Sequence, residues 1–343
     1  MAPVLVTGGS GFVGDATVRA LLAAGRAVRI LDLRDHPQRP PEVEFVQGDV
    51  RDPAAVARAM RGVRVVHHQV AQVPLQKDRA LLESVNVVGT QRVLEAAEAA
   101  GVAKVVLVSS SAVYGVPRTV PITAETPANP GEPYGAAKLA AENVAREFGA
   151  RGLDVAIVRP RTVLGPGRLG IFQMLFEWVR RGRPLYTLGD GHNRYQFVHV
   201  DDLARLCLLA AGTVGPGPWL AGTDTFGSVR ALLVGLVAHA GSVSPVRALP
   251  FAPAQRLMHL TSALGLSPLA PYHALAYGLD VHFDVEPTCR ALGWRPQFSN
   301  AQMMAASYDW YLAHRAEVLA QVDASPHRMP VAPRLLRLLD FLP

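Results

Sequence analysis

The stretch PYGAAKLAAE, residues 133–142, holds a tyrosine and a lysine at a spacing suited to acid/base chemistry. Tyr134 and Lys138 lie four residues apart, so in a helix both side chains stand on the same face, one turn apart. A neighbouring ammonium group favours the ionised phenol and lowers a tyrosine pKa that starts at about 10. Only three of the 34 basic residues are lysines. The pair predicts an acid/base catalyst, although a Y-x-x-x-K pattern also arises by chance.

A glycine-rich segment near the N-terminus predicts a dinucleotide site. The sequence VLVTGGSGFVG, residues 4–14, places Gly8, Gly11 and Gly14 between a strand-like run and a helix-like run. In that context the first glycine allows a tight turn, the second lets a pyrophosphate approach the backbone, and the third permits close packing of the helix on the strand. The free N–H groups at the start of the helix then favour the phosphates.

Two carboxylates follow the next predicted strands. Asp32 ends the second strand, eighteen residues after Gly14, where it can accept hydrogen bonds from the hydroxyls of the adenosine ribose. A carboxylate there repels a 2′-phosphate, so the prediction is NAD, with NADP less favoured; Arg34 could soften that preference. Asp49 closes the third strand, where an adenine contact is expected. The alternative for Asp49 is a turn before Pro53.

The elements that position these residues alternate regularly over the first 160 residues. Strands are predicted at 4–8, 27–32, 43–49, 63–68, 103–110 and 154–160, and helices at 12–25, 53–61, 78–100 and 134–149. Nearly continuous apolar strands that alternate with helices indicate an α/β fold, in which helices cover both faces of a parallel sheet. FVHV (197–200) and a helix from 201 to about 211 predict a return to that sheet.

The pattern loosens after residue 165, where glycine and proline become frequent. Residues 1–165 with about 197–212 are therefore predicted to form the cofactor domain. About 166–196 and 213–325 are predicted to form a smaller, mixed substrate lobe. The segment 326–343 is an amphipathic tail, interpreted as docking on its own protein or a partner subunit, or as contacting a membrane surface.

Composition narrows the function classes. Half of the 343 residues are hydrophobic and 18% are charged, so the chain can bury a large core. The net charge is +6, but the arginines are spread along the chain, which argues against a nucleic-acid partner. Two distant cysteines show no disulfide or metal pattern, and the chain enters a strand without a leader, so a cytoplasmic location is predicted. The neighbours His67 and His68 would face opposite sides of a strand, so no metal site is predicted.

Several ordered motifs together resemble the extended short-chain dehydrogenase/reductase family, also called NAD-dependent epimerase/dehydratase-like proteins. They are T-G-G-S-G-F-V-G (7–14), Asp32, G-D-V-R-D (48–52), N-V-V-G-T (86–90), S-S-S-A-V-Y-G (109–115), Y-G-A-A-K (134–138), R-P (159–160) and F-V-H-V-D-D (197–202). The resemblance is close over 3–212 and looser beyond. It implies a Rossmann-type, doubly wound parallel sheet with a smaller mixed C-terminal lobe, and it raises the expectation of a homodimer formed through paired helices.

The resemblance also implies roles for individual residues. The catalytic group would be Ser110, Tyr134 and Lys138, with Ser111 as the runner-up serine. A Tyr134 phenolate would take the proton of a substrate hydroxyl, Ser110 would hold the same oxygen, Lys138 would bind the nicotinamide ribose, and hydride would pass to nicotinamide C4. Asn86 would support the active-site backbone, or would simply pack inside a helix. The predicted cofactor residues are Gly8, Gly11, Phe12, Val13, Gly14, Asp32, Arg34, Asp49, Val50, Val70, Ala71, Asn86, Tyr134, Lys138, Pro160 and Thr162.

The substrate class is predicted from positions at which this chain differs from the residues usual in the family. Its sugar-nucleotide epimerases usually carry an aromatic–Phe–Asn run where this chain has Pro160, Arg161 and Thr162. Tyr195 stands where those enzymes place an arginine that grips a diphosphate, and Arg194 precedes it. The predicted substrate residues are Ser111, Arg161, Arg194 and Tyr195, and Arg168 could compensate as a further phosphate ligand.

The sequence leaves two predictions of the enzymatic activity open. R-P followed by G-P-G (165–167) resembles the 3β-hydroxysteroid dehydrogenase-like branch and favours an NAD-dependent oxidoreductase. Its substrate would be a secondary alcohol or ketone on a bulky, apolar, sterol-, terpenoid- or polyketide-like molecule. The alternative is a UDP-glucose 4-epimerase-like enzyme with tightly bound NAD. The stretch 250–279 is interpreted as an apolar cover or as ordinary core. Its candidate lining residues are Met258, Leu260, Leu264, Leu266 and Leu269.

Overall fold

The computed structural model describes residues 2–72, 78–252 and 278–320. The predicted tail at 326–343 and the five candidate lining residues of the apolar stretch lie outside these ranges. Within the described ranges, every helix is too short or too polar to span a bilayer.

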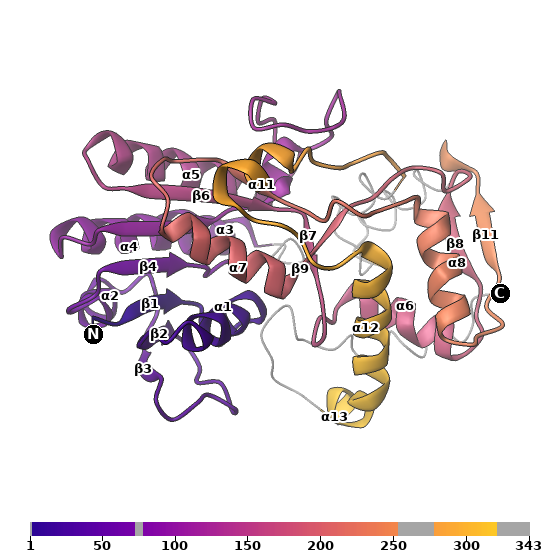
Figure 1. Cartoon of the computed structure of the whole chain (residues 1–343), viewed down its shortest axis with the longest axis horizontal. Coiled ribbons are helices and arrows are strands. Elements are labelled where there is room, and N and C mark those ends of the chain that lie inside the picture. Colours follow the sequence, from indigo (N-terminus) through magenta and orange to yellow (C-terminus); the bar gives the residue numbers. More distant parts are fainter. Residues whose placement is uncertain (1, 73–77, 253–277, 321–343) are drawn as a thin grey trace.

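A seven-stranded, fully parallel sheet forms the centre of the described chain, in the order β10-β6-β5-β4-β1-β2-β3 (Figure 1). Its strands are β1 (Val4–Thr7), β2 (Val28–Asp32), β3 (Glu44–Gln47), β4 (Val65–His68), β5 (Lys104–Val108), β6 (Val155–Pro160) and β10 (Trp219–Ala221). The chain runs outward from β1 in both directions, which confirms the predicted doubly wound Rossmann-type fold.

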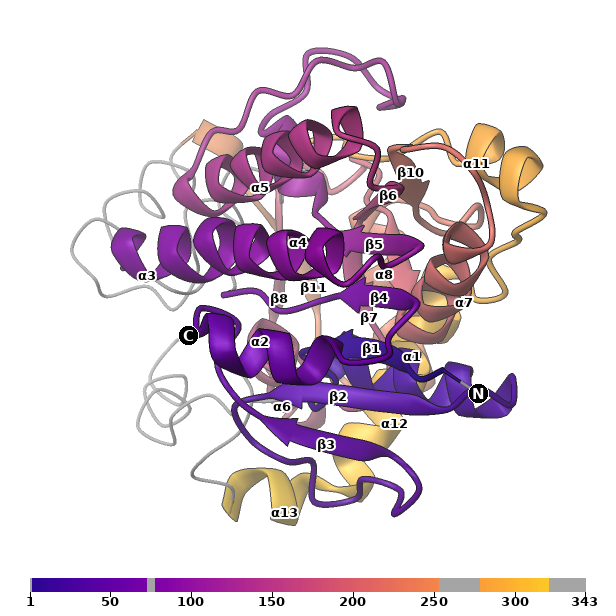
Figure 2. The same ribbon diagram turned by 90° about the vertical axis from the view of Figure 1, so that its left-hand side faces the viewer.

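Helices cover both faces of this sheet (Figure 2). One face carries α2 (Pro53–Met60), α4 (Gly89–Ala99) and α5 (Pro133–Ala150), and the other carries α1 (Phe12–Ala23) and α7 (Val200–Ala211). Side chains on β1 show why the strands are apolar throughout. Val4 and Val6 pack with residues of α1, whereas Leu5 packs with residues of α2, α4 and α5, and all three are buried. Successive side chains of a strand point to opposite faces of the sheet, and helices cover both faces. The strand is therefore apolar at every position.

One predicted strand lies elsewhere. FVHV does not return to the central sheet, because β9 (Phe197–His199) pairs with β7 (Thr162–Leu164) in a separate two-stranded sheet. The free edge of β6 is occupied by β10 instead. The helix after FVHV does pack on the central sheet, since Leu203 and Leu206 of α7 are buried together with Val106 and Ala156. That prediction was therefore wrong for the strand and right for the helix.

The predicted long helix at 78–100 is three joined segments: α3 (Arg79–Glu83), the π-helical turn η1 (Ser84–Val88) and α4. The remaining segments of the described chain are the 3₁₀ turn η2 (Ser111–Tyr114), α6 (Ile171–Arg180), β8 (Leu185–Leu188), α8 (Val229–His239), β11 (Val246–Leu249), α11 (Glu286–Leu292), α12 (Asn300–Ala313) and α13 (Arg315–Ala320).

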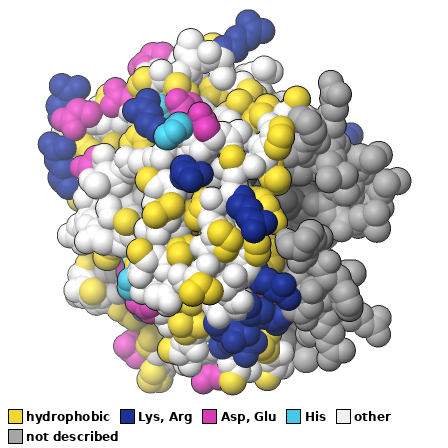
Figure 3. All heavy atoms as spheres, turned by 90° about the vertical axis from the view of Figure 1, so that its right-hand side faces the viewer, with side chains coloured by type: hydrophobic (Ala, Val, Ile, Leu, Met, Phe, Trp, Pro, Cys, Tyr) yellow, Lys and Arg dark blue, Asp and Glu magenta, His cyan; other side chains and the backbone are white. Residues whose placement is uncertain are grey.

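Helices α6, α8 and α12 pack around a separate core, here called the second lobe, in which Phe176 of α6, Leu233 of α8, and Met303 and Tyr311 of α12 are buried together. Figure 3 shows basic side chains at several separate places on the outer face of this lobe, with hydrophobic side chains between them. The positive charge on this face is therefore spread and not gathered into one patch.

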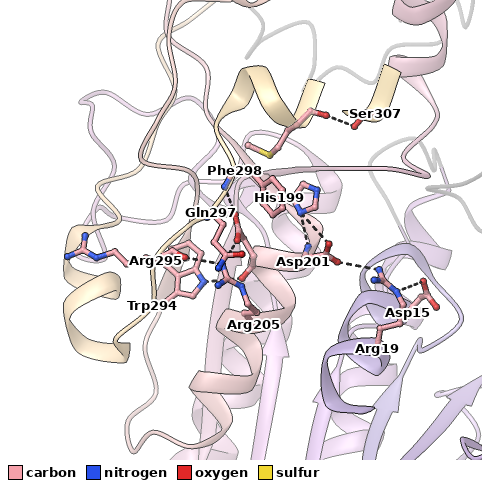
Figure 4. A network of polar contacts seen from close by, with 12 residues as sticks. Asp15, Arg19, His199, Asp201, Arg205, Trp294, Arg295, Gln297, Phe298 and Ser307 are labelled. Atoms are coloured by element: carbon pink, nitrogen blue, oxygen red, sulfur yellow. Dashed lines mark hydrogen bonds and ion pairs between the residues drawn. The ribbon is translucent and has the colours of Figure 1, made fainter. Parts of the chain in front are cut away.

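Asp202, in the first turn of α7, joins this helix to the segment that leads into α12. Figure 4 shows Arg205, Trp294, Gln297 and Phe298 close together at this junction. Its buried carboxylate accepts hydrogen bonds from Arg205 and from the backbone N–H groups of Gln297 and Phe298. Its backbone oxygen accepts one from Nε1 of Trp294 at 3.0 Å. The F-V-H-V-D-D motif therefore fixes how the second lobe sits on the sheet.

Glu177 of α6 is the most heavily paired carboxylate of the second lobe's described residues. Its buried side chain lies 2.6 Å from Nε of Arg315 and 3.1 Å from nitrogens of Arg180 and Arg181, and it accepts a hydrogen bond from the Tyr311 hydroxyl at 2.9 Å. Burial alone would raise the pKa of Glu177, but the hydrogen bonds from Arg315, Arg180 and Tyr311 outweigh it and lower the pKa to about 2.

We expect Glu177→Gln to remove part of the protein's acid sensitivity. The pKa of Glu177 is depressed in the folded state, so its contribution to stability is complete above the ordinary value of 4.5 and is lost as pH falls toward about 2. The variant should have a lower Tm at pH 7 and a flatter loss of Tm between about pH 5 and 3, measured by circular dichroism. Glu286→Gln, at a half-exposed ion pair, is the control. Equal acid slopes for Glu177→Gln and the wild type would contradict this role.

Candidate active site

A cavity of about 1290 Å³ opens at the carboxyl ends of the central strands. It exceeds the roughly 300–1,000 Å³ of an ordinary ligand pocket, so it has room for a dinucleotide together with a substrate. The cavity brings together most of the predicted site residues. Those that line it are Gly8, Gly11, Phe12, Val13, Gly14, Asp32, Arg34, Asp49, Val50, Val70, Ala71, Ser110, Ser111, Tyr134, Lys138, Pro160, Arg161, Thr162 and Arg168. Asn86, Arg194 and Tyr195 do not line it.

The glycine loop has the geometry that a pyrophosphate site requires. Gly8 follows β1 with a φ of +74°, a conformation that other residues rarely adopt. A Cβ placed on Gly14 would lie 2.0 Å from the carbonyl oxygen of Gly8, so only glycine lets α1 pack this closely on the turn. Gly11 is the N-cap of α1 and carries no side chain to cap the first N–H groups. The start of a helix favours an anionic ligand, which fits the diphosphate of NAD.

The two carboxylates differ in their partners. Asp32 accepts hydrogen bonds from the backbone N–H groups of Ser10 at 3.1 Å and Leu33 at 2.7 Å, while burial raises its pKa. Asp49 accepts hydrogen bonds from the Arg51 guanidinium, at 2.6 Å, and from the Arg51 backbone N–H, and the guanidinium lowers its pKa. Asp32 fits a ribose at the end of β2. Asp49 stabilises its own turn as it lines the cavity, and its adenine contact stays a prediction.

Tyr134 and Lys138 stand one turn apart at the start of α5, as predicted. The carboxylate of Glu132 caps this helix, accepting hydrogen bonds from the backbone N–H groups of Tyr134 at 2.8 Å and Gly135 at 2.6 Å. Nζ of Lys138 donates a hydrogen bond to the Val108 carbonyl at 2.9 Å. Burial lowers the pKa of Lys138 to about 8, partly opposed by the charge of Glu142.

Gly135 brings the helix against the serine turn. A Cβ at this position would lie 2.4 Å from the carbonyl oxygen of Ala112, so α5 can contact η2 only through glycine. Ser110 caps η2, its Oγ accepting a hydrogen bond from the Ala112 N–H at 3.1 Å. Ser109, Ser110 and Ser111 all line the cavity, and the Ser109 hydroxyl donates a hydrogen bond to Glu142. The predicted serine, tyrosine and lysine therefore share one wall.

A buried polar network lies behind that wall and was not predicted from the sequence. Glu142 accepts hydrogen bonds from Ser109 at 2.6 Å and from Nε of Arg159 at 2.8 Å, and Arg159 also donates to the Tyr114 hydroxyl at 2.7 Å. Both charged side chains are almost fully buried. The network joins β5, α5 and β6 at their active-site ends. The available signal was Glu142 itself, which follows Lys138 by one further helical turn.

Asn86 and His68 hold the strand-end backbone. Asn86, in the π-helical turn, accepts a hydrogen bond from the N–H of Gln72 at 2.8 Å and donates one to its carbonyl at 3.1 Å. His68 lies between the hydroxyls of Thr7 at 2.7 Å and Thr90 at 3.0 Å. Burial, aided by the charge of Lys138, lowers the His68 pKa to about 3, so this imidazole stays neutral. Among the described residues no group of three metal-binding side chains comes together.

The side chains of Thr162, Arg194 and Tyr195 are each paired with another side chain. The hydroxyls of Thr162 and Tyr195 lie 2.9 Å apart and bond to each other. Arg194 lies 3.3 Å from Nε2 of His282. Arg168 is partly buried in the cavity wall; burial lowers its pKa to about 10, and the neighbouring Tyr134 phenol partly offsets this.

The model of the NAD dependent epimerase/dehydratase family matches residues 4–219. This chain belongs to that family. Three relatives show its range: the uncharacterized protein y4nG of Sinorhizobium fredii, 47% identical over 98% of this chain and 85% of that protein; a 2-alkyl-3-oxoalkanoate reductase of Stenotrophomonas maltophilia, 30% over 86% and 95%; and a UDP-glucose 4-epimerase of Mycolicibacterium smegmatis, 31% over 90% and 97%. The extended short-chain dehydrogenase/reductase prediction is confirmed.

A solved structure agrees with the cofactor assignment. DesIV, the dTDP-glucose 4,6-dehydratase of Streptomyces venezuelae, was crystallised with NAD and TYD; it is 30% identical and superimposes with a TM-score of 0.75 over 92% of this chain and 98% of DesIV. The cofactor of the present protein is therefore NAD, as predicted. The glycine loop and Asp32 are the residues of this chain that fit it.

Proposed function

We propose that the protein oxidises or reduces a secondary alcohol or ketone carbon of a bulky, mainly apolar substrate, with NAD as the cofactor. The observation that carries the proposal is the joint placement of Ser110, Tyr134 and Lys138 on one wall of the cavity that also holds the glycine loop. The relative named 2-alkyl-3-oxoalkanoate reductase supports it, since that name describes the reduction of an oxo group on an alkylated chain.

In the proposed mechanism, the Tyr134 hydroxyl exchanges a proton with the substrate oxygen and Ser110 holds the same oxygen. Bound NAD supplies the hydride acceptor for oxidation. Lys138, fixed by the Val108 carbonyl, keeps a positive charge one turn from the phenol and favours its ionised form. A positioned proton transfer of this kind typically contributes about 10²–10⁴-fold to the rate.

The paired hydroxyls of Thr162 and Tyr195 favour an apolar substrate over a nucleotide sugar. These two positions are those at which the family's sugar-nucleotide epimerases would place an asparagine and a diphosphate-binding arginine. Here each side chain satisfies the other at 2.9 Å, so neither is held ready for a nucleotide diphosphate. The alternative proposal, epimerisation of a UDP-sugar on retained NAD, is favoured by the 31% identity to UDP-glucose 4-epimerase over 90% of this chain.

Net formation of NADH separates the two proposals. The purified enzyme is first tested for retained NAD, because an epimerase must reuse its cofactor without releasing it. Absorbance of NADH is then followed with a panel of hydroxysteroids and long-chain secondary alcohols, and with a panel of UDP-sugars. We expect net NADH with the apolar alcohols alone. Interconversion of UDP-sugars on retained NAD, with no net NADH from any alcohol, would reject the proposal in favour of the epimerase.

A further inference from the structure

Arg161 buries a positive charge that the fold leaves unmatched. The residue follows Pro160 at the end of β6 and is 2% exposed. Its Nη1 and Nη2 are shielded from solvent and have no hydrogen-bond partner in the part of the chain that the structure describes. Only Nε is engaged, donating a long hydrogen bond of 3.4 Å to the Gln196 carbonyl. A guanidinium stays charged at any ordinary pH, so such a group is costly unless it serves a ligand.

Two aromatic rings flank the Arg161 guanidinium. The guanidinium lies over the rings of Tyr195 and Phe283, with 5.0 and 5.5 Å to their centroids. Ring faces attract a cation but accept none of its N–H groups in ordinary hydrogen bonds. Burial and the charges of Arg194 and Arg161 lower the pKa of His282, partly opposed by the charge of Asp280. Nδ1 of His282 is also buried and has no hydrogen-bond partner among the described residues. The pocket therefore presents unused donors and positive charge, which together select an anion.

The same residue belongs to the wall of the catalytic cavity. Arg161 lines it together with Tyr134, Lys138 and its chain neighbours Pro160 and Thr162. An anion that reached Nη1 and Nη2 would therefore be attached to the molecule whose carbinol faces Tyr134. Two adjacent guanidinium N–H groups match the two oxygens of one carboxylate in a bidentate pair.

We propose that Arg161 binds a carboxylate group of the substrate, which makes the substrate class hydroxy acids and oxo acids with an apolar body. This inference rests on the proposed function, since it names the substrate of the same cavity. A single carboxylate suits the site better than a diphosphate, because the neighbouring hydroxyls of Thr162 and Tyr195 are already paired and Arg194 is turned to His282.

The first test compares each acid with its methyl ester. A panel of 3-hydroxy fatty acids and hydroxysteroid carboxylic acids, each as acid and ester, is assayed by NADH formation with the wild type, Arg161→Met and Arg161→Lys. The wild type should favour acids on the order of 100-fold in kcat/KM, the effect expected when a buried charge loses its partner. In Arg161→Met the preference should disappear because kcat/KM falls for the acids and not for the esters. Arg161→Lys should keep part of the preference. Arg290→Met, at an exposed arginine of α11, is the matched control.

Equal rates for acids and esters in the wild type, or equal losses for both in Arg161→Met, would overturn the carboxylate role. No NADH from acids, esters or neutral alcohols would reject the proposed function instead. A second readout then judges Arg161 without turnover. Arg161→Met should melt no lower than the wild type without ligand, because it removes an unmatched charge. Decanoate with NAD should raise the Tm of the wild type and not of the variant. Equal decanoate shifts, or a variant that melts lower, would assign Arg161 to packing alone.

Discussion

Replacing Tyr134 with phenylalanine is expected to reduce kcat by about 10³-fold, within the range that a positioned acid/base group contributes. The hydroxyl is lost, but the ring can still pack against Leu82 and Ala112, so the fold and the cavity should persist. NAD affinity should therefore stay within two- or three-fold. Steady-state NADH kinetics measure the first quantity, and a fluorescence titration with NADH measures the second.

Tyr114 provides the matched control, because it is a second buried tyrosine. Its hydroxyl accepts a hydrogen bond from Arg159 and donates one to the Thr123 carbonyl at 3.2 Å, and Tyr114 does not line the cavity. Tyr114→Phe should lower the Tm and retain most of kcat. Full activity in Tyr134→Phe would remove this phenol from the mechanism. Equal losses in both variants would mean that the effect comes from packing.

Features set by short stretches of chain were predictable from the sequence. The spacing of Gly8 and Gly14 reflects contacts within one turn, where a side chain at Gly14 would collide with the Gly8 carbonyl. Tyr134 and Lys138 are related by one turn of one helix, so their spacing fixed their shared face. In both cases the residues that determine the geometry are also the residues that make the motif.

Features set by distant partners were not predictable. FVHV has a strand pattern, but the pattern does not say which strand it pairs with, and it pairs with β7. The strand that pairs with the edge of β6 is the three-residue β10, which lies between Pro218 and Gly222. Glu142 and Arg159 each resemble ordinary surface charges in the sequence. Only the packing of α5 across β5 and β6 brings them together in a buried pair. Likewise, Thr162 and Tyr195 could be recognised as departures from the family, but not as partners of each other.

Removing the carboxylate of Glu142 should have the largest effect on stability. Glu142→Ala leaves the Arg159 guanidinium, which is 3% exposed, without its charged partner. Breaking a buried pair from one side typically costs about 3–5 kcal/mol, so we expect the Tm to fall by roughly 10 °C. The charge of Glu142 also raises the pKa of Lys138, so its removal should lower that pKa further below about 8. As pH rises, Lys138 of the variant should lose its proton earlier, so the alkaline decline in activity should begin at a lower pH than in the wild type.

Thermal unfolding and a pH–rate profile test these two effects separately. Glu147→Ala, at an exposed glutamate of the same helix, should change neither. The double variant Glu142→Leu with Arg159→Met removes both charges and should recover most of the lost Tm, because an apolar pair of similar size needs no partner in a buried site. A Tm for Glu142→Ala equal to that of the wild type would mean that this pair adds nothing to stability. An unshifted pH–rate profile would mean that Lys138 keeps its protonation state without the carboxylate one turn away. Both effects are expected together because the same carboxylate balances Arg159 on one side and Lys138 on the other, which couples the folding of β5, α5 and β6 to the charge beside Tyr134.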